Sequence, residues 1–291
     1  MGIQQIFNGV TLGMSYALIA VGYSLVFGIL RLVNFSHGSV YAFGTTITLY
    51  LISFNFGVMP AIIAGIILTG LLNILIDKAA MEPLRKQGAA SITSLITTIG
   101  ISNIITNLLI VSFGSQRRQF PSLFPDKTMS ILGVDIQYTQ IGMLLISLVL
   151  MVILVLLVNK TKIGLAMRAS QQNMKAAKLM GINVNFVVSF TFLIGGISAA
   201  IAGVLVSSYY GIAYPNMGYV SGLKAFAAAV LGGIGSLPGS IIGGVLVGIS
   251  ESAAATFLGS EFRDSVAFII LIVVLVIRPN GLLGKKDIEK V

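Results

Sequence analysis

The sequence contains no cysteine and only one histidine, His37. Without cysteine the chain can form neither a disulfide framework nor a thiolate metal site. A single histidine excludes the usual His-rich zinc and haem arrangements. We therefore expect no metal site and no cofactor bound by this chain.

Two motifs of catalysis are also missing. The sequence has no Gly-x-Ser-x-Gly elbow and no Gly-x-x-x-x-Gly-Lys-Ser/Thr phosphate loop. It therefore predicts that the chain is not an enzyme. Any ATP that drives its activity would have to be hydrolysed by another chain.

Charged residues are scarce. They make up 9% of the 291 residues, compared with about 25% in an ordinary soluble domain. Apolar types account for 56%, and the mean hydropathy is +0.99. A soluble domain would have too few charges to cover its surface, whereas lipid removes that requirement. A membrane span takes about 20 residues, so this length allows roughly eight.

Apolar segments recur along the chain with short polar interruptions, which predicts an all-α, polytopic helical bundle. We predict spans near 6–29, 38–56, 60–77, 92–113, 140–158, 187–209, 222–236, 238–257 and 265–278. Glycines and Pro238 break the segment 222–257, which is either two short spans with a tight turn or one re-entrant element. The total is therefore about eight, give or take one.

The N-terminal residues 1–13 have neither a basic region nor a small-residue cleavage site, so we expect the first apolar run to remain as a span. No polar segment is long enough to bury a core of its own. We expect one membrane domain over residues 1–291, whose lipid-exposed surface contacts the membrane directly.

Positive charge is unevenly distributed between the predicted loops. The net charge is +9, and thirteen of the 18 Lys and Arg residues lie in 78–91, in 159–186, in the C-terminal tail or at Arg31. These regions fall on one side if the spans alternate, which predicts that this side and the C-terminus are cytoplasmic. Nine crossings would put the N-terminus outside. The same distribution argues against nucleic acid as a partner.

The inner segment 159–186 is basic, has no proline and is rich in good helix formers. It predicts short helices with a weakly apolar side, and Gly181 is a natural helix end. Such a helix could dock in a groove of a partner protein. It could equally be a solvated loop held at the membrane by lipid phosphates.

Five segments carry a family resemblance when taken in order. Residues 8–28, 34–44, 160–184, 224–251 and 278–285 include NFSHGSVYAFG, GLAMRASQQNMKAAKLMGINV and RPNGLLGK. Together they resemble the permeases of ATP-binding-cassette importers, and most closely the branched-chain amino acid permease family. The resemblance covers nearly the whole chain.

The resemblance implies a permease subunit in a bacterial plasma (inner) membrane. It implies a second, homologous permease, two ATPase subunits that bind the ATP, and an extracytoplasmic solute-binding protein. The segment 159–186 would couple to an ATPase, and its candidate coupling residues are Arg168, Ala176, Ala177, Lys178 and Gly181. Lys175 stands where the wider permease pattern has Glu, and no Ile-x-Leu-Pro follows, which puts in doubt a salt bridge of the wider type.

Few ionisable groups lie at membrane depth, and such groups are candidates for function. Glu251 and Lys224 are the clearest. Glu251 could form a structural pair with Lys224 or Arg263, lie at the interface, or line the solute path. A zwitterionic amino acid would need one cation and one anion nearby. Asn34 and His37 are further path candidates, although they could simply cap the following helix.

Two other features leave alternatives open. The glycines of 195–203 and 232–248 allow close helix packing, and could also let helices slide between transport states. Outside, Arg117 and Arg118 with nearby aromatic residues suit an interfacial belt or a docking surface for a binding protein.

Taken together, the sequence predicts a permease subunit of an importer for branched-chain amino acids that works by alternating access. A permease for urea, short amides or other amino acids would share every motif. A secondary transporter and a structural membrane protein are the remaining alternatives.

Overall fold

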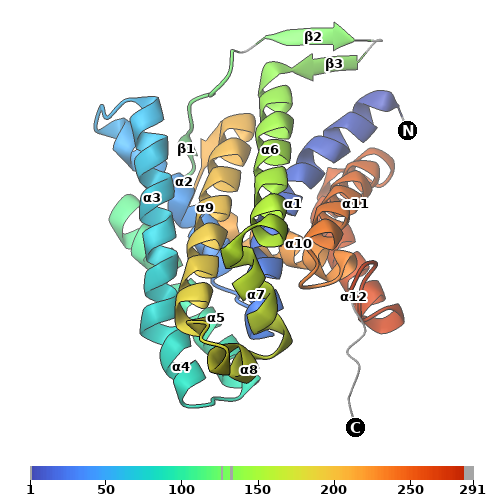
Figure 1. Ribbon diagram of the computed structural model, residues 1–291. Coiled ribbons are helices and arrows are strands. Elements are labelled where there is room, and N and C mark those ends of the chain that lie inside the picture. Colours follow the sequence, from blue (N-terminus) through green and yellow to red (C-terminus); the bar gives the residue numbers. More distant parts are fainter. Residues whose placement is uncertain (1, 126, 132–133, 285–291) are drawn as a thin grey trace.

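The chain folds into a helical bundle, seen in a computed structural model that describes residues 2–125, 127–131 and 134–284. Each predicted apolar segment corresponds to a helix (Figure 1). These helices are α1 (Ile3–Leu30), α2 (His37–Ser53), α3 (Val58–Ile76), α5 (Ser91–Phe113), α6 (Tyr138–Lys160), α9 (Val184–Tyr210), α10 (Met217–Gly232), α11 (Leu237–Phe257) and α12 (Arg263–Ile277).

Six helical segments of the described residues are long and apolar enough to cross a membrane. They are α1, α5, α6, α9, α11 and a continuous stretch in which α3 runs on through a π-turn (Asp77–Met81) into α4 (Glu82–Lys86). Helices α2, α10 and α12 have 17, 16 and 15 residues, which is shorter than a full span. The molecule is therefore a polytopic helical membrane protein, and the predicted total of about eight crossings depends on these shorter helices.

The Gly/Pro-rich segment forms two helices joined by a tight turn. Helix α10 ends at Gly232, and α11 begins at Leu237 with Pro238 in its first turn. Gly233 and Gly235 adopt φ values of 102° and 89°, which favour glycine. The backbone N–H of Gly239 donates to Oγ of Ser236, 3.2 Å away, and this bond caps α11.

Four short strands supplement the predicted all-α fold. β2 (Thr128–Ile131) pairs antiparallel with β3 (Val134–Gln137), and β1 (Arg118–Gln119) pairs antiparallel with β4 (Ile212–Ala213). The segments outside the helices pair their backbone groups with one another in this way. The β1–β4 pair also ties the loop before α6 to the end of α9.

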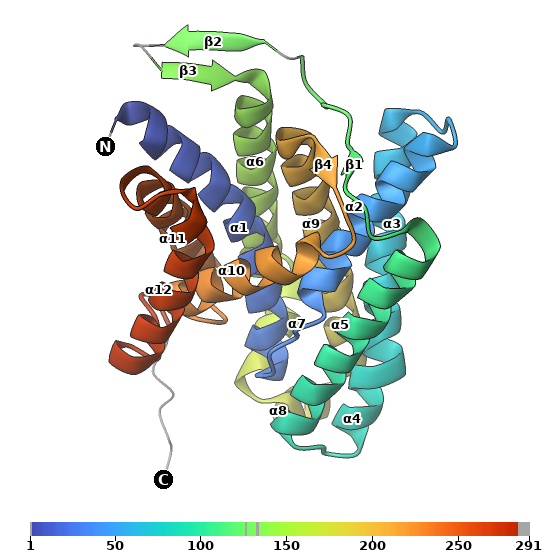
Figure 2. The same ribbon diagram turned by 180° about the vertical axis from the view of Figure 1, so that it is seen from behind.

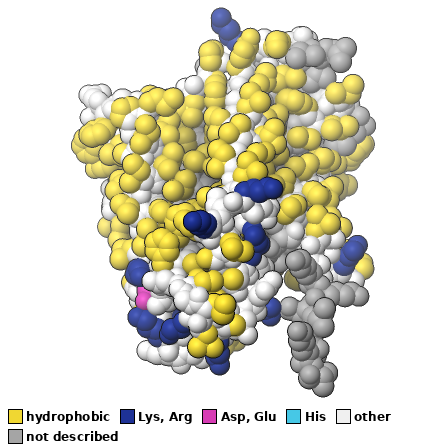
Figure 3. Space-filling view, viewed as in Figure 1, with side chains coloured by type: hydrophobic (Ala, Val, Ile, Leu, Met, Phe, Trp, Pro, Cys, Tyr) yellow, Lys and Arg dark blue, Asp and Glu magenta, His cyan; other side chains and the backbone are white. Residues whose placement is uncertain are grey.

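The two ends of the bundle differ in charge. Helices α4, α7 (Lys162–Gln172) and α8 (Met174–Leu179) lie at one end, and the β2–β3 hairpin and the start of α1 lie at the other (Figures 1 and 2). Hydrophobic side chains cover most of the face in Figure 3, and Lys and Arg gather mainly toward the end with α4 and α8. The basic loops 78–91 and 159–186 thus share one end. Lys285, Lys286 and Lys290 lie outside the described residues.

Helix α1 occupies the centre of the bundle, packed against α9, α10 and α11. Its closest neighbour is α11, because glycines line both helices at the contact. A Cβ on Gly248 would overlap the backbone N and Cα of Gly13, and a Cβ on Gly13 would lie 2.5 Å from Cα of Val245. The glycines therefore serve close backbone packing here.

Replacing Gly248 by leucine should disrupt this contact. The neighbouring atoms are backbone and cannot move aside, and overpacking of this kind costs about 1–3 kcal/mol or more. We expect a lower unfolding temperature for the purified protein in detergent. Gly100→Ala is the control, because a Cβ there meets nothing within 4 Å and alanine favours the helix. Equal unfolding temperatures for the two variants would contradict the packing role.

Candidate coupling and translocation sites

The basic segment 159–186 forms two short helices, and three side chains define where its helices begin. Oγ1 of Thr161 accepts the N–H of Gly164 at the start of α7, 3.0 Å away. Oδ1 of Asn173 accepts the N–H of Ala176 at the start of α8, and Oδ1 of Asn183 accepts the N–H of Phe186 at the start of α9. These caps fix the path of the chain between α6 and α9.

Helix α8 ends at the glycine singled out from the sequence. Gly181 has a φ of 83°, in the left-handed region. Its N–H donates to the carbonyl of Lys178 at 3.1 Å, and the N–H of Ile182 donates to the carbonyl of Ala177 at 3.0 Å. This bonding pattern is the Schellman motif, in which glycine is preferred. A Cβ at Gly181 would meet nothing within 4 Å, so the constraint on this residue is conformational.

The candidate coupling residues divide between two faces. Ala176, Lys178 and Gly181 are exposed, whereas Ala177 is buried. Arg168 is half-buried and donates a hydrogen bond to the carbonyl of Val158. Ala177 and Arg168 therefore hold the segment to the rest of the chain.

Two apolar side chains project beside the exposed coupling residues. Leu179 and Met180 are 88% and 83% exposed, at the basic end of the molecule. Burying each of them fully would contribute about 1.5–3 kcal/mol. Adjacent exposed apolar side chains outside the span helices are typical of a surface that another protein covers.

Helix α7 lies against the base of the bundle. Met167 and Ser170 are buried. The amide of Gln171 lies between α1 and the α10–α11 turn, since its Nε2 would be 3.5 Å from a Cβ on Gly28 and 3.7 Å from one on Gly235. A displacement of α7 would therefore act directly on both.

Lys224 and Glu251 form a buried ion pair between α10 and α11. Nζ of Lys224 lies 2.9 Å from Oε1 of Glu251, and the two residues are 5% and 1% exposed. The hydroxyl of Tyr16 on α1 donates to Oε2 of Glu251 at 2.8 Å. The sequence-based pairing of Lys224 with Glu251 is thus present in the structure, joined by a tyrosine that the sequence did not indicate.

Two charged residues at the start of α12 extend this pair. Oδ1 of Asp264 lies 2.6 Å from Nζ of Lys224, and Nε of Arg263 lies 3.6 Å from Oε1 of Glu251. The group contains two cations and two anions, so its charges balance. Asp264 is exposed and leads from the pair to the surface. Its position at the start of an apolar segment was the only sequence signal for it.

Asn34 and His37 lie inside the bundle, where they are 2% and 1% exposed. Oδ1 of Asn34 accepts the N–H and the hydroxyl of Ser36, at 3.1 Å and 2.6 Å, which fits the predicted capping role. The ring of His37 lies 4.8 Å from that of Tyr23, and a Cβ on Gly22 would overlap it. In the part of the chain that the structure describes, neither residue hydrogen-bonds to Lys224 or Glu251.

Helix α5 carries polar side chains that the sequence analysis did not single out. Thr98 and Ser102 face α2: Oγ1 of Thr98 accepts the N–H of Phe35 at 3.2 Å, and the hydroxyl of Ser102 lies 2.5 Å from that of Ser39. Asn103 and Asn107 are exposed on the surface of α5, one helical turn apart. A polar amide within an apolar helix needs a partner other than lipid.

Comparisons with known proteins agree with one another. The family model described as branched-chain amino acid transport system / permease component matches residues 5–275. The high-affinity branched-chain amino acid transport system permease protein BraD of Pseudomonas aeruginosa is 39% identical, over 99% of this chain and 98% of its own. LivH of Escherichia coli K12, with the same description, is 37% identical over 99% and 97%.

The bundle also resembles a solved structure. A chain of PsaBC from Streptococcus pneumoniae, determined in complex with Fab, aligns with a TM-score of 0.54 at 13% identity. The alignment covers 95% of this chain and 91% of that one. At this identity the likeness concerns the fold alone.

Removing one partner of the buried ion pair should destabilise the protein. Lys224→Met leaves Glu251 buried beside fewer positive charges, and breaking a buried pair costs about 3–5 kcal/mol. The double variant Lys224→Met with Glu251→Leu should recover part of that loss in thermal unfolding. Glu261→Gln, at an exposed carboxylate near α12, is the control. A single Lys224→Met variant as stable as this control would show that the pair contributes nothing.

Proposed function

The chain belongs to the branched-chain amino acid transport system permease family, and on this basis we propose that it is the membrane-spanning permease subunit of an ATP-binding-cassette importer for branched-chain amino acids. The full-length similarity to BraD and LivH, both named as high-affinity branched-chain amino acid permeases, carries the proposal. Urea, short amides and other amino acids are less well supported, because these relatives are named for branched-chain amino acids.

The subunit would act with four partners. Two ATPase subunits bind and hydrolyse ATP, a second homologous permease completes the channel, and an extracytoplasmic binding protein delivers the solute. The exposed Leu179, Met180 and Lys178 at the basic end support an ATPase contact there. Charge reversal between permease and ATPase surfaces would then alter both affinity and the rate of association.

The orientation follows from the positive-inside rule. The end with α4, α7 and α8 is cytoplasmic, as is the C-terminus, and the β2–β3 hairpin lies outside the bacterial inner membrane. With α2, α10 and α12 counted, about eight or nine crossings result, for which odd parity puts the N-terminus outside. The whole chain is one membrane domain, with residues 159–186 as its coupling segment.

The solute path would run past the polar groups of the bundle interior and of α5. Lys224 and Glu251 provide the cation and anion that a zwitterionic amino acid needs, and Asn34 and His37 lie on the α1–α2 side. The exposed Asn103 supports a path between two permeases. It stands about 18 Å from the start of α5 and about 15 Å from its end, near the membrane midplane. A second permease with solute between the subunits would give its amide polar partners.

The proposal is tested by uptake into proteoliposomes that contain the permease pair, the ATPases and the binding protein. Labelled leucine should accumulate only with ATP inside the compartment that holds the ATPases, and unlabelled isoleucine should compete while urea should not. Dissipating the ion gradient with ATP kept high separates this importer from a secondary transporter. Uptake that follows the gradient and ignores ATP would contradict the proposal.

Changes on the coupling segment should separate ATP hydrolysis from uptake. Gly181→Trp places a bulky residue at a left-handed position, and Lys178→Glu reverses an exposed charge. We expect leucine uptake to fall about tenfold, within the usual range of coupling effects between two sites. Reversal of the half-buried Arg168 should act in addition through its bond to Val158.

The matched control is Lys127→Glu, a reversal at an exposed lysine of the loop that leads into β2, at the opposite end of the bundle. It should leave coupling unchanged. Wild-type uptake by the Gly181 and Lys178 variants would remove the coupling role of this segment.

A further inference from the structure

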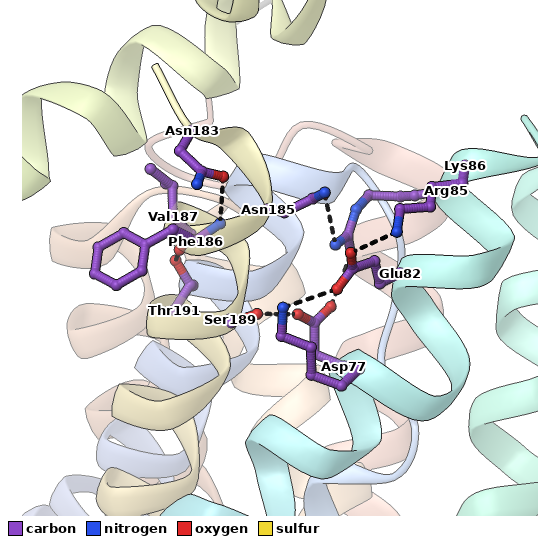
Figure 4. A network of polar contacts seen from close by, with 11 residues as sticks. Asp77, Glu82, Arg85, Lys86, Asn183, Asn185, Phe186, Val187, Ser189 and Thr191 are labelled. Carbon is purple, nitrogen blue, oxygen red and sulfur yellow. Dashed lines mark hydrogen bonds and ion pairs between the residues drawn. The ribbon is translucent and has the colours of Figure 1, made fainter. Parts of the chain in front are cut away.

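A second buried charge cluster lies at the cytoplasmic end, where α3 passes into α4. The carboxylate of Asp77 is fully buried. Nη1 of Arg85 lies 2.8 Å from Oδ1 of Asp77, and the hydroxyl of Ser189 donates to Oδ2 at 2.6 Å. Nη2 of Arg85 also donates to Oδ1 of Asn185 at 3.5 Å. Figure 4 shows these side chains converging from the α3–α4 stretch and from α9.

The π-turn is what brings Asp77 and Arg85 together. Eight residues of a regular α-helix turn through 100° each, which would leave the two side chains about 80° apart around the axis. The wider π-turn at Asp77–Met81 rotates less per residue and so reduces this offset. Both side chains can then face α9, and π-turns of this kind occur frequently at functional sites.

The cluster joins two parts of the chain that meet only at this end. Asn185 and Ser189 lie in the first two turns of α9, directly after the coupling segment. Asn183 caps α9 two residues before Asn185. Any displacement of α8 that moves the start of α9 therefore reaches Asp77 and Arg85 first.

Stability alone is a poor reason for such a cluster. Burying a carboxylate and a guanidinium costs desolvation that their attraction roughly repays, and apolar residues of similar volume often serve as well. Directional bonds to Ser189 and Asn185 instead fix how α9 lies against the α3–α4 stretch. The geometry thus suits a rigid connection between the two.

We propose that Asp77, Arg85, Ser189 and Asn185 form a clamp that passes the movement of the coupling segment from α9 to α3 during transport. The proposal rests on the proposed importer function and adds positioning residues to it. The clamp makes the start of α9 and the α3–α4 stretch move as one unit. Without it, the coupling segment would move while α3 stayed behind.

Glu82 provides a matched control in the same stretch. Its carboxylate pairs with Nζ of Lys78 and of Lys86, at 2.9 Å each. Both pairs are four residues apart along the chain, and they do not reach α9. Glu82→Gln therefore removes a carboxylate and two ion pairs from the same turn without breaking the connection to α9.

The experiment uses the complete transporter in proteoliposomes and measures ATP hydrolysis and leucine uptake on the same preparations. The variants are Asp77→Asn, Ser189→Ala, Ser189→Thr and Glu82→Gln, each quantified for assembled complex. We expect Asp77→Asn and Ser189→Ala to retain ATP hydrolysis but to lower the leucine imported per ATP about tenfold. Ser189→Thr, which keeps the hydroxyl, and Glu82→Gln should retain the wild-type ratio.

Three results would overturn the clamp. Uptake and hydrolysis could fall together in proportion to the amount of assembled complex, which would indicate a structural role only. The ratio could stay unchanged in Asp77→Asn and Ser189→Ala, or Ser189→Thr could fail to rescue it. Failure of the importer proposal is recognised separately, because the wild-type complex itself would then show no ATP-driven leucine uptake.

Discussion

The close contact between α1 and α11 is the interaction on which the rest of the bundle depends. Glycines on both helices let the backbones meet, and α1 thereby becomes the buried centre against which α9 and α10 also pack. The same contact carries Tyr16 to Glu251, so the buried ion pair with Lys224 is completed by a group from the central helix. In lipid, where apolar side chains gain little by leaving the solvent for one another, such close backbone packing is a main source of helix association.

The coupling segment is connected to this bundle by two separate routes. Helix α7 contacts α1 and the α10–α11 turn through Gln171, and so leads to the helices that hold Lys224 and Glu251. Helix α8 leads through Asn183 into α9, and from there to Asp77 and Arg85 on the α3–α4 stretch. One cytoplasmic handle can therefore act on both halves of the molecule, which alternating access requires.

The sequence predicted the features that stand out against an apolar background. Lys224 and Glu251 were found because charges are rare in such segments, and Gly181 because helix ends favour glycine. Asp77 was missed because it falls at the boundary of a predicted span, where a carboxylate is ordinary, and because no periodic pattern reveals a π-turn. Asn103 and the strands were missed because single polar residues and two-residue pairings leave little trace in composition. Which charges meet across 112 residues, as Asp77 and Ser189 do, is decided by helix packing.

The central claim is that an ATPase covers the exposed end of α8 on the cytoplasmic side. Because the chain has no cysteine, a Met180→Cys variant offers a single reactive thiol. The direct measurement is its labelling by a membrane-impermeant maleimide, in intact cells and in inside-out vesicles, with and without the ATPase subunits. The account predicts labelling only in inside-out vesicles, and protection once the ATPases are bound. Labelling from outside intact cells, or equal labelling with and without the ATPases, would contradict it.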